Sequence, residues 1–265
     1  MVKGGLLTAF IGMGILFAGC TSEMDVNTES EKEQKASKKI NKTEWSYKGD
    51  TGPDRWGDLS PEFKLCKTGK KQSPIDIRET KKEKLPKINF NYEKSKLKVI
   101  NNGHTIKVKY DKGSYIKYED KRCDLLQFHF HTPSEHLIKG RAFPMEVHFV
   151  HKCDDGNLLV IGVMMKQGKE NKTIKDIWAV MPEEVGKSVE SDIKINAKNL
   201  LPKKRTYYTY EGSLTTPPCS EGVTWIVMKE GIEVSKSQIE KFRKLYDMNS
   251  RPVQPLNDRV VKEAS

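Results

Sequence analysis

All six histidines of this 265-residue chain lie between residues 104 and 151. Imidazole is the side chain that most often binds metals or carries protons near neutral pH. In the run Gln127-Phe128-His129-Phe130-His131, polar and aromatic residues alternate. In a β-strand this alternation places Gln127, His129 and His131 on one face. Two imidazoles at this spacing could share one tetrahedral metal ion.

A third candidate ligand, His148, lies in the run Glu146-Val147-His148-Phe149-Val150, which has the same alternation. The segment between His131 and His148 contains two prolines and a glycine, so the chain can turn and return antiparallel. Three nitrogen ligands with an open fourth position are typical of catalytic zinc, whereas structural zinc has four protein ligands. The alternative is three core histidines, each satisfied by a hydrogen bond.

Strand-like runs must position these histidines. From residue 88 onward, short runs are rich in β-branched and aromatic residues: LKVINNGHTIKVKY, DLLQFHFH, MEVHFVH, NLLVIGVMM and GVTWIVM. The clearest helix signal is SKSQIEKFRKLYD, where Ser235 and Gln238 form a capping-box pattern. Because strands outnumber helices and do not alternate with them, we predict a mainly β (α+β) single domain. Its core would be a large, mostly antiparallel sheet with few peripheral helices.

The composition indicates a soluble domain. Hydrophobic residues make up 36% and charged residues 31% of the chain, which is too polar for a polytopic membrane protein and too apolar for a disordered chain. With 47 Lys plus Arg against 36 Asp plus Glu, the formal net charge is +11. No nucleic-acid motif accompanies this charge, so we predict no nucleic-acid partner and interpret the excess as a solvated surface.

The first 43 residues are predicted to lie outside the domain. Residues 1–19, with Lys3 ahead of an apolar run, have the pattern of a secretory signal peptide. The segment Ala18-Gly19-Cys20 resembles the lipobox of bacterial lipoproteins, which implies lipidation of Cys20. Residues 21–43 contain no aromatic residue, and we predict that 20–43 form a flexible tether.

The domain itself is therefore expected at 44–265, exported and lipid-anchored at the bacterial cell surface or in the periplasm. The lipid would be its only membrane contact. The alternative is an ordinary secreted protein in which Cys20 is incidental.

Four cysteines remain in the predicted domain: Cys66, Cys123, Cys153 and Cys219. An even number in an exported protein favours disulfides, and no C-x-x-C pair suggests a thiolate zinc site. Four cysteines allow three pairings, among which spacing alone does not decide.

Short motifs are spread along almost the whole predicted domain. They are Trp45 to Tyr47, Gly52-Pro53 with Trp56, Gln72 to Ile77, Asn102-Gly103-His104, the FHFH run, Pro133 to His136, Glu146 to His151, Ser213 to Pro218, Val223 to Trp225, Arg251-Pro252 and Gln254 to Leu256. In their order and spacing, these motifs resemble the α-class carbonic anhydrases, in particular bacterial exported members. The resemblance implies a strongly twisted sheet of about ten strands, with zinc at the base of a conical cleft.

The resemblance also implies roles for individual residues. His129, His131 and His148 would be the Zn²⁺ ligands, and Gln127 and Glu146 would orient the ligand rings.

The substrate side of the implied site involves further residues. Thr215 would hydrogen-bond to Glu135 and orient the zinc-bound hydroxide, while Thr216 would help to hold the substrate. The apolar wall for carbon dioxide would consist of Val150, Val160, Leu214, Val223 and Trp225.

The implied activity is reversible hydration of carbon dioxide to bicarbonate and a proton, by attack of the zinc-bound hydroxide. His104 matches the proton shuttle of the family; the alternative is a surface histidine in an Asn-Gly turn. Lys107 stands where many members have Asn or Gln, and an ammonium group near the cleft would disfavour a charged imidazole. His136 and His151 match family positions but are expected to be structural.

Two further expectations concern the cysteines. The resemblance implies a Cys66–Cys219 disulfide that joins the start of the domain to the loop after Thr215. Cys123 and Cys153 flank the two ligand strands, and a second bridge there remains an alternative to two free thiols.

Two other classes of function compete with the hydratase. One is a catalytically silent binding or adhesion module of the same fold, although such relatives typically lack one or more ligand histidines. The other is a zinc esterase, because zinc hydroxide also attacks activated carbonyls.

Overall fold

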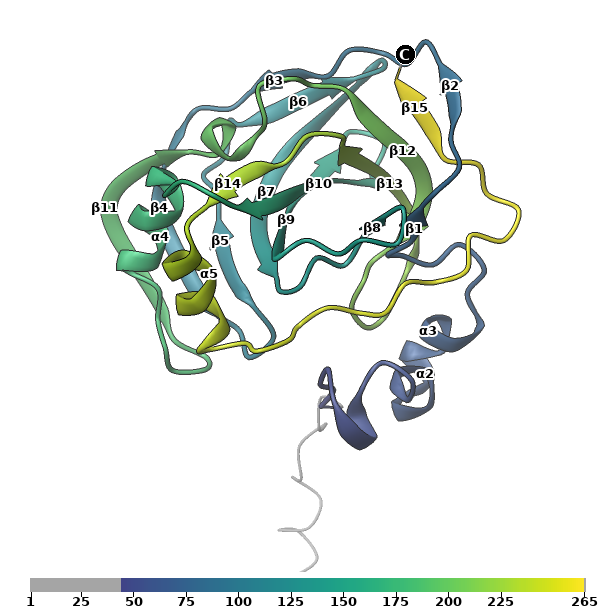
Figure 1. The fold of residues 1–265 in the computed structure, drawn as a ribbon, viewed down its shortest axis with the longest axis horizontal. Helices are drawn as coiled ribbons and strands as arrows, with labels where there is room; N and C mark the ends of the chain where they lie inside the picture. The colour runs from purple at the N-terminus through teal and green to yellow at the C-terminus, as the bar shows by residue number, and fades with distance from the viewer. Residues whose placement is uncertain (1–43, 265) are drawn as a thin grey trace, which may run out of the picture. The chain divides into compact units, whose positions relative to one another are not determined.

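The predicted strand-forming runs become strands in the computed structural model, which describes residues 44–264 (Figure 1). The predicted leader, tether and Cys20 lie outside the described residues. The strands are β1 (Asp76–Ile77), β2 (Lys81–Glu83), β3 (Asn89–Asn91), β4 (Lys94–Asn101), β5 (Ile106–Lys109), β6 (Tyr115–Tyr118), β7 (Lys121–His131), β8 (Leu137–Ile138), β9 (Met145–Cys153), β10 (Leu158–Gln167), β11 (Ser188–Asn196), β12 (Tyr207–Ser213), β13 (Glu221–Met228), β14 (Ile232–Val234) and β15 (Lys262–Ala264).

Thirteen of these strands form one large sheet. Its main path runs β11-β4-β5-β7-β9-β10-β13-β12-β15-β2, while β14 pairs with β10 and the β3-β6 pair joins β7. The pairings are antiparallel except for β10 with β13, β10 with β14, and β15 with β2. The predicted mainly β fold is therefore confirmed, with ten strands along the main path and a minority of parallel pairs. The separate β1-β8 pair forms a small parallel sheet.

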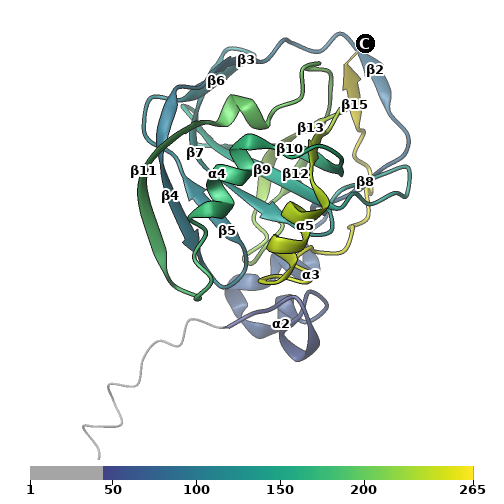
Figure 2. The same cartoon turned by 60° about the vertical axis from the view of Figure 1, so that its left-hand side comes forward.

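Helices are short and peripheral. They are α2 (Trp56–Leu59), α3 (Leu65–Thr68), α4 (Lys172–Ala179) and α5 (Lys236–Arg243), with 3-10 turns η1 (Gly49–Thr51), η2 (Pro61–Phe63) and η3 (Ala197–Leu200). Figure 2 shows α4 and α5 beside each other against the sheet, and the Trp178 and Phe242 rings between them lie 5.5 Å apart. These two helices cover the sheet face opposite the predicted ligands.

The predicted capping box is present at the start of α5. The Ser235 hydroxyl accepts from the Gln238 amide, and the Gln238 side chain accepts from the Ser235 amide. The helix ends at Arg243: the Lys244 amide still donates to the Glu240 carbonyl, and the Leu245 amide then closes a tighter turn onto the Phe242 carbonyl. The helix is therefore shorter than the predicted run SKSQIEKFRKLYD, and Tyr246 lies beyond its end.

The core lies on both faces of the large sheet. On one face, Phe128, Phe130 and Phe149 pack with Trp178 of α4 and Phe242 of α5. The opposite face carries a smaller cluster that includes Ile75, Val160 and Trp225. A third cluster places Trp56 against the Cys66–Cys219 disulfide.

One irregularity in β7 decides which side chains face which side. The pairing of β7 with β9 shifts register between Leu125 and Gln127, so Leu126 is an extra residue that is 47% exposed. Before this β-bulge, Cys123 and Leu125 face the helix-covered core; after it, Phe128 and Phe130 do. The bulge therefore inverts the alternation and turns the odd-numbered histidines to the other face.

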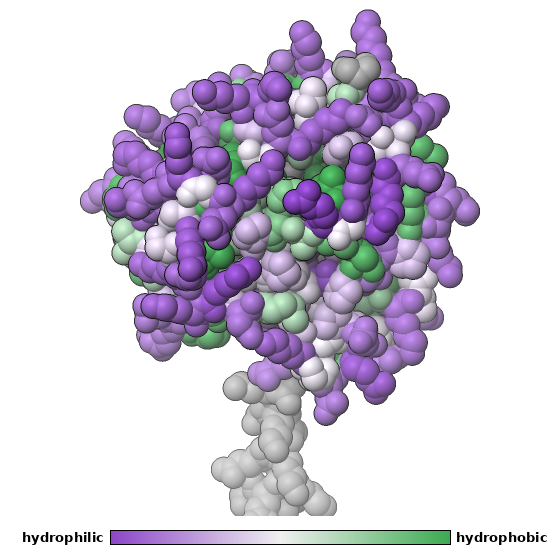
Figure 3. All heavy atoms as spheres, viewed as in Figure 1, coloured by the Kyte–Doolittle hydropathy of each residue, from purple (hydrophilic) through white to green (hydrophobic). Residues whose placement is uncertain are grey.

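The described surface is mostly hydrophilic, as Figure 3 shows for one face. Large exposed apolar side chains such as Val185 and Val260 occur singly. Within residues 44–264, no helix is long and apolar enough to cross a membrane.

Candidate metal centre

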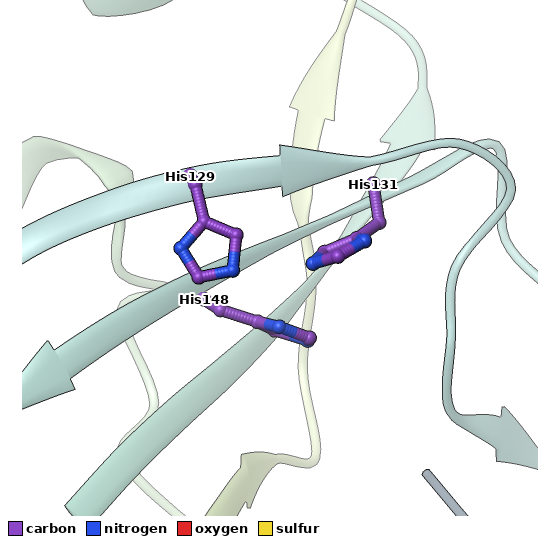
Figure 4. Close-up of side chains that lie close together, drawn as sticks. All are labelled: His129, His131 and His148. Atoms are coloured by element: carbon purple, nitrogen blue, oxygen red, sulfur yellow. The ribbon is translucent and has the colours of Figure 1, made fainter. Parts of the chain in front are cut away.

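Three histidines from β7 and β9 come together on one face of the sheet. His129 is directly opposite His148 in the antiparallel pair, and His131 is opposite Glu146. The ring centroids lie 5.1 Å apart for His129 and His131, 5.5 Å for His129 and His148, and 4.5 Å for His131 and His148. Figure 4 shows the three rings around one common space.

Each ring has one nitrogen engaged by the protein. His129 Nδ1 lies 2.9 Å from Gln127 Oε1, and His131 Nδ1 donates to the backbone carbonyl of Asn249 at 2.7 Å. His148 Nε2 lies 2.8 Å from Glu146 Oε1, although the contact does not have hydrogen-bond alignment. The nitrogen that contacts the protein is Nδ1 in His129 and His131 and Nε2 in His148. His129 and His131 would therefore offer Nε2 to a metal, whereas His148 would offer Nδ1.

This arrangement fits a metal ion. One ligand atom from each of the three histidines lies within 4.8 Å of the others. His131 Nε2 is buried without a hydrogen-bond partner among the described residues, and such an atom requires an explanation. Three imidazole nitrogens with no thiolate are the donor set of a catalytic zinc site.

Electrostatics keeps two of the ligands neutral. Burial, reinforced by the neighbouring imidazoles, holds the pKa of His129 well below its ordinary value, and burial also lowers the pKa of His131. For His148, burial is outweighed by Glu146, which raises its pKa. Neutral imidazoles present the lone pairs that a metal requires.

Glu146 is held in place by a buried polar chain. The backbone amides of Glu135 and His136 both donate to its Oε2 at 2.9 Å, and His136 Nδ1 lies 2.8 Å from Oε1. His136 Nε2 contacts the Tyr210 hydroxyl at 2.7 Å. His136, Glu146 and His148 also cluster within 4.8 Å, but these hydrogen bonds give His136 a structural role.

Gly162 of β10 provides room for this arrangement. It is the register partner of His148, and a Cβ atom at this position would lie 2.6 Å from Glu146 Oε1. Its φ is not positive, so the glycine is required by space and not by backbone conformation. Sequence reasoning did not identify this residue.

Asn249 was also missed. Its carbonyl orients His131, while its side chain accepts from the Thr132 amide and donates to the carbonyls of His104 and Phe130. The residue is fully buried. No local signal could have identified it, because it lies 118 residues from His131 along the chain.

A cavity of about 160 Å³ opens in front of the histidines. Of the residues predicted for the site, its lining includes His104, Gln127, the three candidate ligands, Val150, Val160, Leu214, Thr215, Thr216 and Trp225. Val223, predicted for the wall, is instead buried in the cluster behind it with Val160 and Trp225. Trp45, Tyr47, Asn102, Thr105 and Lys107 complete the lining.

Glu135 lies behind the cavity and is 1% exposed. Its Oε1 accepts from the Arg251 amide at 2.8 Å, while its Oε2 has no hydrogen-bond partner among residues 44–264. The Arg251 guanidinium is fixed in turn by Gln72 and by the carbonyl of Cys66. Thr215 is buried on the loop between β12 and β13.

His104 and Lys107 also line the cavity. The His104 ring stacks on Trp45 with centroids 3.7 Å apart and an interplanar angle of 6°. Lys107 of β5 is the register partner of His129, and its charge contributes to the lowered pKa of that histidine.

His151, by contrast, faces the core. Its Nε2 lies 2.7 Å from the Tyr92 hydroxyl, and burial lowers its pKa to about 4.

Both pairs of cysteines form disulfides. Cys66 is bonded to Cys219, the pairing that the family resemblance implied, and Cys123 is bonded to Cys153. The first bridge ties the loop that carries Thr215 to α3. The second joins β7 to β9, which resolves the alternative left open by the sequence.

Comparisons with known proteins agree with this geometry. Residues 51–265 match the model of the protein family described as eukaryotic-type carbonic anhydrase. The chain is 50% identical over 225 residues to a carbonic anhydrase of Neisseria gonorrhoeae, covering 84% of this chain and 89% of that protein.

Two solved structures are similar as well. One is an α-carbonic anhydrase from Thermovibrio ammonificans in complex with the inhibitor sulfanilamide, at 51% identity and a TM-score of 0.81; the match covers 83% of this chain and 99% of that one. The other is a hyperthermostable carbonic anhydrase identified from an active hydrothermal vent chimney, at 57% identity and a TM-score of 0.81. That match covers 84% of this chain and 100% of the neighbour.

Proposed function

Because this chain belongs to the eukaryotic-type carbonic anhydrase family, a family of zinc enzymes that hydrate carbon dioxide, we propose that His129, His131 and His148 hold its zinc ion. The reaction is the reversible hydration of carbon dioxide to bicarbonate and a proton. The observation that carries the assignment is the convergence of three imidazoles, each with its other nitrogen engaged by the protein. When bound, zinc supplies a Lewis acid that makes water nucleophilic near neutral pH, a property for which carbonic anhydrases in general are known.

Thr215 and Glu135 orient the nucleophile. The Arg251 amide fixes one carboxylate oxygen of Glu135 and leaves Oε2 as a buried acceptor. Thr215 lines the cavity, and in the working enzyme its hydroxyl would donate its proton to this oxygen, so that it can only accept a hydrogen bond from the attacking oxygen. That direction leaves a lone pair of the nucleophile aimed at the substrate carbon.

The apolar side of the cavity holds carbon dioxide. Val150, Val160, Leu214 and Trp225 line the cavity and present no electrophilic group that would compete with carbon dioxide for the nucleophile. Thr216 lines the same cavity. Val223 supports this wall from behind.

His104 carries the released proton toward solvent. Its imidazole lines the cavity and is partly exposed, and imidazole is the side chain best suited to exchange protons near neutrality. Lys107 adds a positive charge to the same cavity, which opposes a protonated imidazole.

The test combines zinc analysis with stopped-flow hydration of carbon dioxide. Wild type should hold one zinc per chain, and His131→Ala should lose most of the zinc and the activity. His151→Gln is the matched control, because it removes a buried histidine outside the site and should keep the metal. If His131→Ala retains full zinc and activity, the ligand assignment is wrong.

The competing functions are weaker. A silent binding module has no need for the complete ligand set that this chain retains. An esterase would need room for an acyl chain, and the cavity measures about 160 Å³. Comparing ester turnover with hydration on one preparation separates the hydratase from the esterase.

We further propose that the chain is exported and anchored through Cys20, with residues 20–43 as the tether to the catalytic domain at 44–265. The two disulfides support an oxidising compartment.

A further inference from the structure

The Cys123–Cys153 disulfide encloses the entire candidate ligand set. Its two cysteines are direct register partners in β7 and β9, and they are separated by 30 residues in sequence. His129, His131 and His148 all lie within this segment. The bridge is buried on the helix-covered face, opposite to the histidines.

The bulge at Leu126 lies between the bridge and the ligands. From Cys123 to His129, β7 advances six residues, whereas β9 needs only five from Cys153 to His148. The extra residue allows Cys123 to face the core while His129 faces the cavity.

The alternation makes this geometry sensitive to register. If the strands paired without the bulge, strict alternation from Cys123 would turn His129 and His131 toward the core. Phe128 and Phe130 would then face the cavity. A one-residue slip would therefore remove two of the three ligands from the site.

On its other edge β7 pairs with two strands, and the residues that link them also contact the bulge: the Tyr110 amide donates to the Leu126 carbonyl at 3.1 Å, and the Leu125 amide donates to the Ser114 carbonyl at 2.8 Å. On that edge, β6 pairs with residues 121–124 and β5 pairs with residues 127–129. Among the described strands, only β9 pairs with both halves of β7. A single strand, β9, therefore sets the register of both halves on its own edge of β7, and the disulfide ties β9 covalently to the first half.

We propose that the Cys123–Cys153 disulfide is a register lock, which keeps the bulge at Leu126 and holds His129 and His131 against His148, so that metal release is slow. The inference rests on the proposed zinc site. It makes Cys123 and Cys153 positioning residues for the metal, beyond any contribution to global stability.

The test measures zinc release from loaded protein into an excess of a chelating dye at neutral pH. Cys123→Val/Cys153→Val replaces the bridge with an apolar cross-strand pair, and release should accelerate on the order of tenfold or more. Cys66→Ala/Cys219→Ala is the matched control. It opens the longer bridge without touching the ligand strands, and release should stay within about threefold of wild type.

A second comparison uses a single polypeptide. The Cys66→Ala/Cys219→Ala protein is refolded with zinc in the presence or absence of a dithiol reductant, which is removed before the assay because dithiols bind zinc. Within residues 44–264, the two samples then differ in the Cys123–Cys153 bond. The reduced form should release zinc faster and show faster amide hydrogen exchange in residues 127–131 and 146–150. This comparison applies even where the valine pair fails to fold.

Equal release from the oxidised and reduced forms would overturn the lock. The lock would also be overturned if the Cys123→Val/Cys153→Val protein released zinc as slowly as wild type, because apolar packing would then be enough to hold the register. Failure of the zinc site itself gives a different result: wild type would hold less than one zinc per chain, or His131→Ala would retain it.

Discussion

His104 is the residue whose position bears most directly on turnover. Its ring lines the cavity and stacks on Trp45. We predict that His104→Ala lowers the maximal hydration rate by roughly tenfold or more and leaves kcat/KM nearly unchanged, because attack on carbon dioxide precedes proton release. Stopped-flow assays with and without added imidazole measure both effects, and imidazole should restore part of the loss.

A comparison variant and one contrary outcome complete the test of the shuttle assignment. Lys107→Asn provides a comparison in which the imidazole remains but the nearby charge is removed. If His104→Ala turns over as fast as wild type in a low concentration of a poorly penetrating buffer, another proton route operates.

Gly162 sets the space available to Glu146. An added methyl group would lie 2.6 Å from Glu146 Oε1 and force the carboxylate away from His148. We predict that Gly162→Ala lowers zinc affinity on the order of tenfold, the range found when partners of metal ligands are disturbed. Competition with a chelator of known affinity measures this loss.

A double-mutant cycle isolates the cause of that loss. In the Glu146→Ala background, Gly162→Ala should cost little more, because the displaced group is already gone. Fully additive losses would show that Gly162 acts through something other than Glu146.

At the scale of elements, the loop between β12 and β13 depends on a distant anchor. Cys66 and Cys219 are separated by 153 residues, and the Cys219 amide donates to the Thr216 carbonyl at 2.9 Å. By constraining the unfolded chain, this bridge can add at most roughly 5 kcal/mol to the free energy of unfolding. We predict that Cys66→Ala/Cys219→Ala lowers the free energy of unfolding by a large part of that amount and also reduces turnover, because the Thr215 loop is loosened.

Urea denaturation and stopped-flow hydration measure these two effects. Peptide mapping of the exported protein should recover Cys66 and Cys219 linked. Recovery of both as free thiols, or a variant as stable as wild type, contradicts the prediction.

At the scale of the whole molecule, His151 makes stability depend on pH. Burial lowers its pKa from 6.5 to about 4, so the unfolded chain binds a proton at this position before the folded chain does. Stability is therefore lost as the pH falls from about 6.5 to about 4, and the loss at pH 5 is about 2 kcal/mol. We predict that His151→Gln removes this part of the dependence.

Urea titrations of both proteins at pH 7 and pH 5 provide the measurement. The metal ligands titrate equally in both chains, so the difference between them reports on His151. An equal loss in the two proteins would assign the pH dependence to other groups.

Anchoring also concerns the molecule as a whole. If Cys20 is lipidated, wild type expressed in a bacterium that processes lipoproteins should partition into the membrane and detergent phases, and Cys20→Ser should move to the aqueous phase. Intact-mass analysis of the mature N-terminus gives an independent measurement. An unmodified Cys20 in exported protein would favour the alternative of simple secretion.

Local patterns in the sequence determined much of this protein. Alternation over three to five residues correctly places His129 with His131 and His148 with Glu146, because strand periodicity needs no long-range information. The capping box of α5 is likewise a contact between residues three apart. The even number of cysteines predicted disulfides, although not their pairing.

Only the tertiary structure decided the remaining features. The bulge at Leu126 inverts the alternation of β7, and nothing in the local pattern announces it. Gly162 and Asn249 matter because sheet order brings them against Glu146 and His131 from other elements. The pairing of Cys123 with Cys153 follows from the same register. These contacts depend on how strands far apart in sequence align, which the residues near each position do not encode.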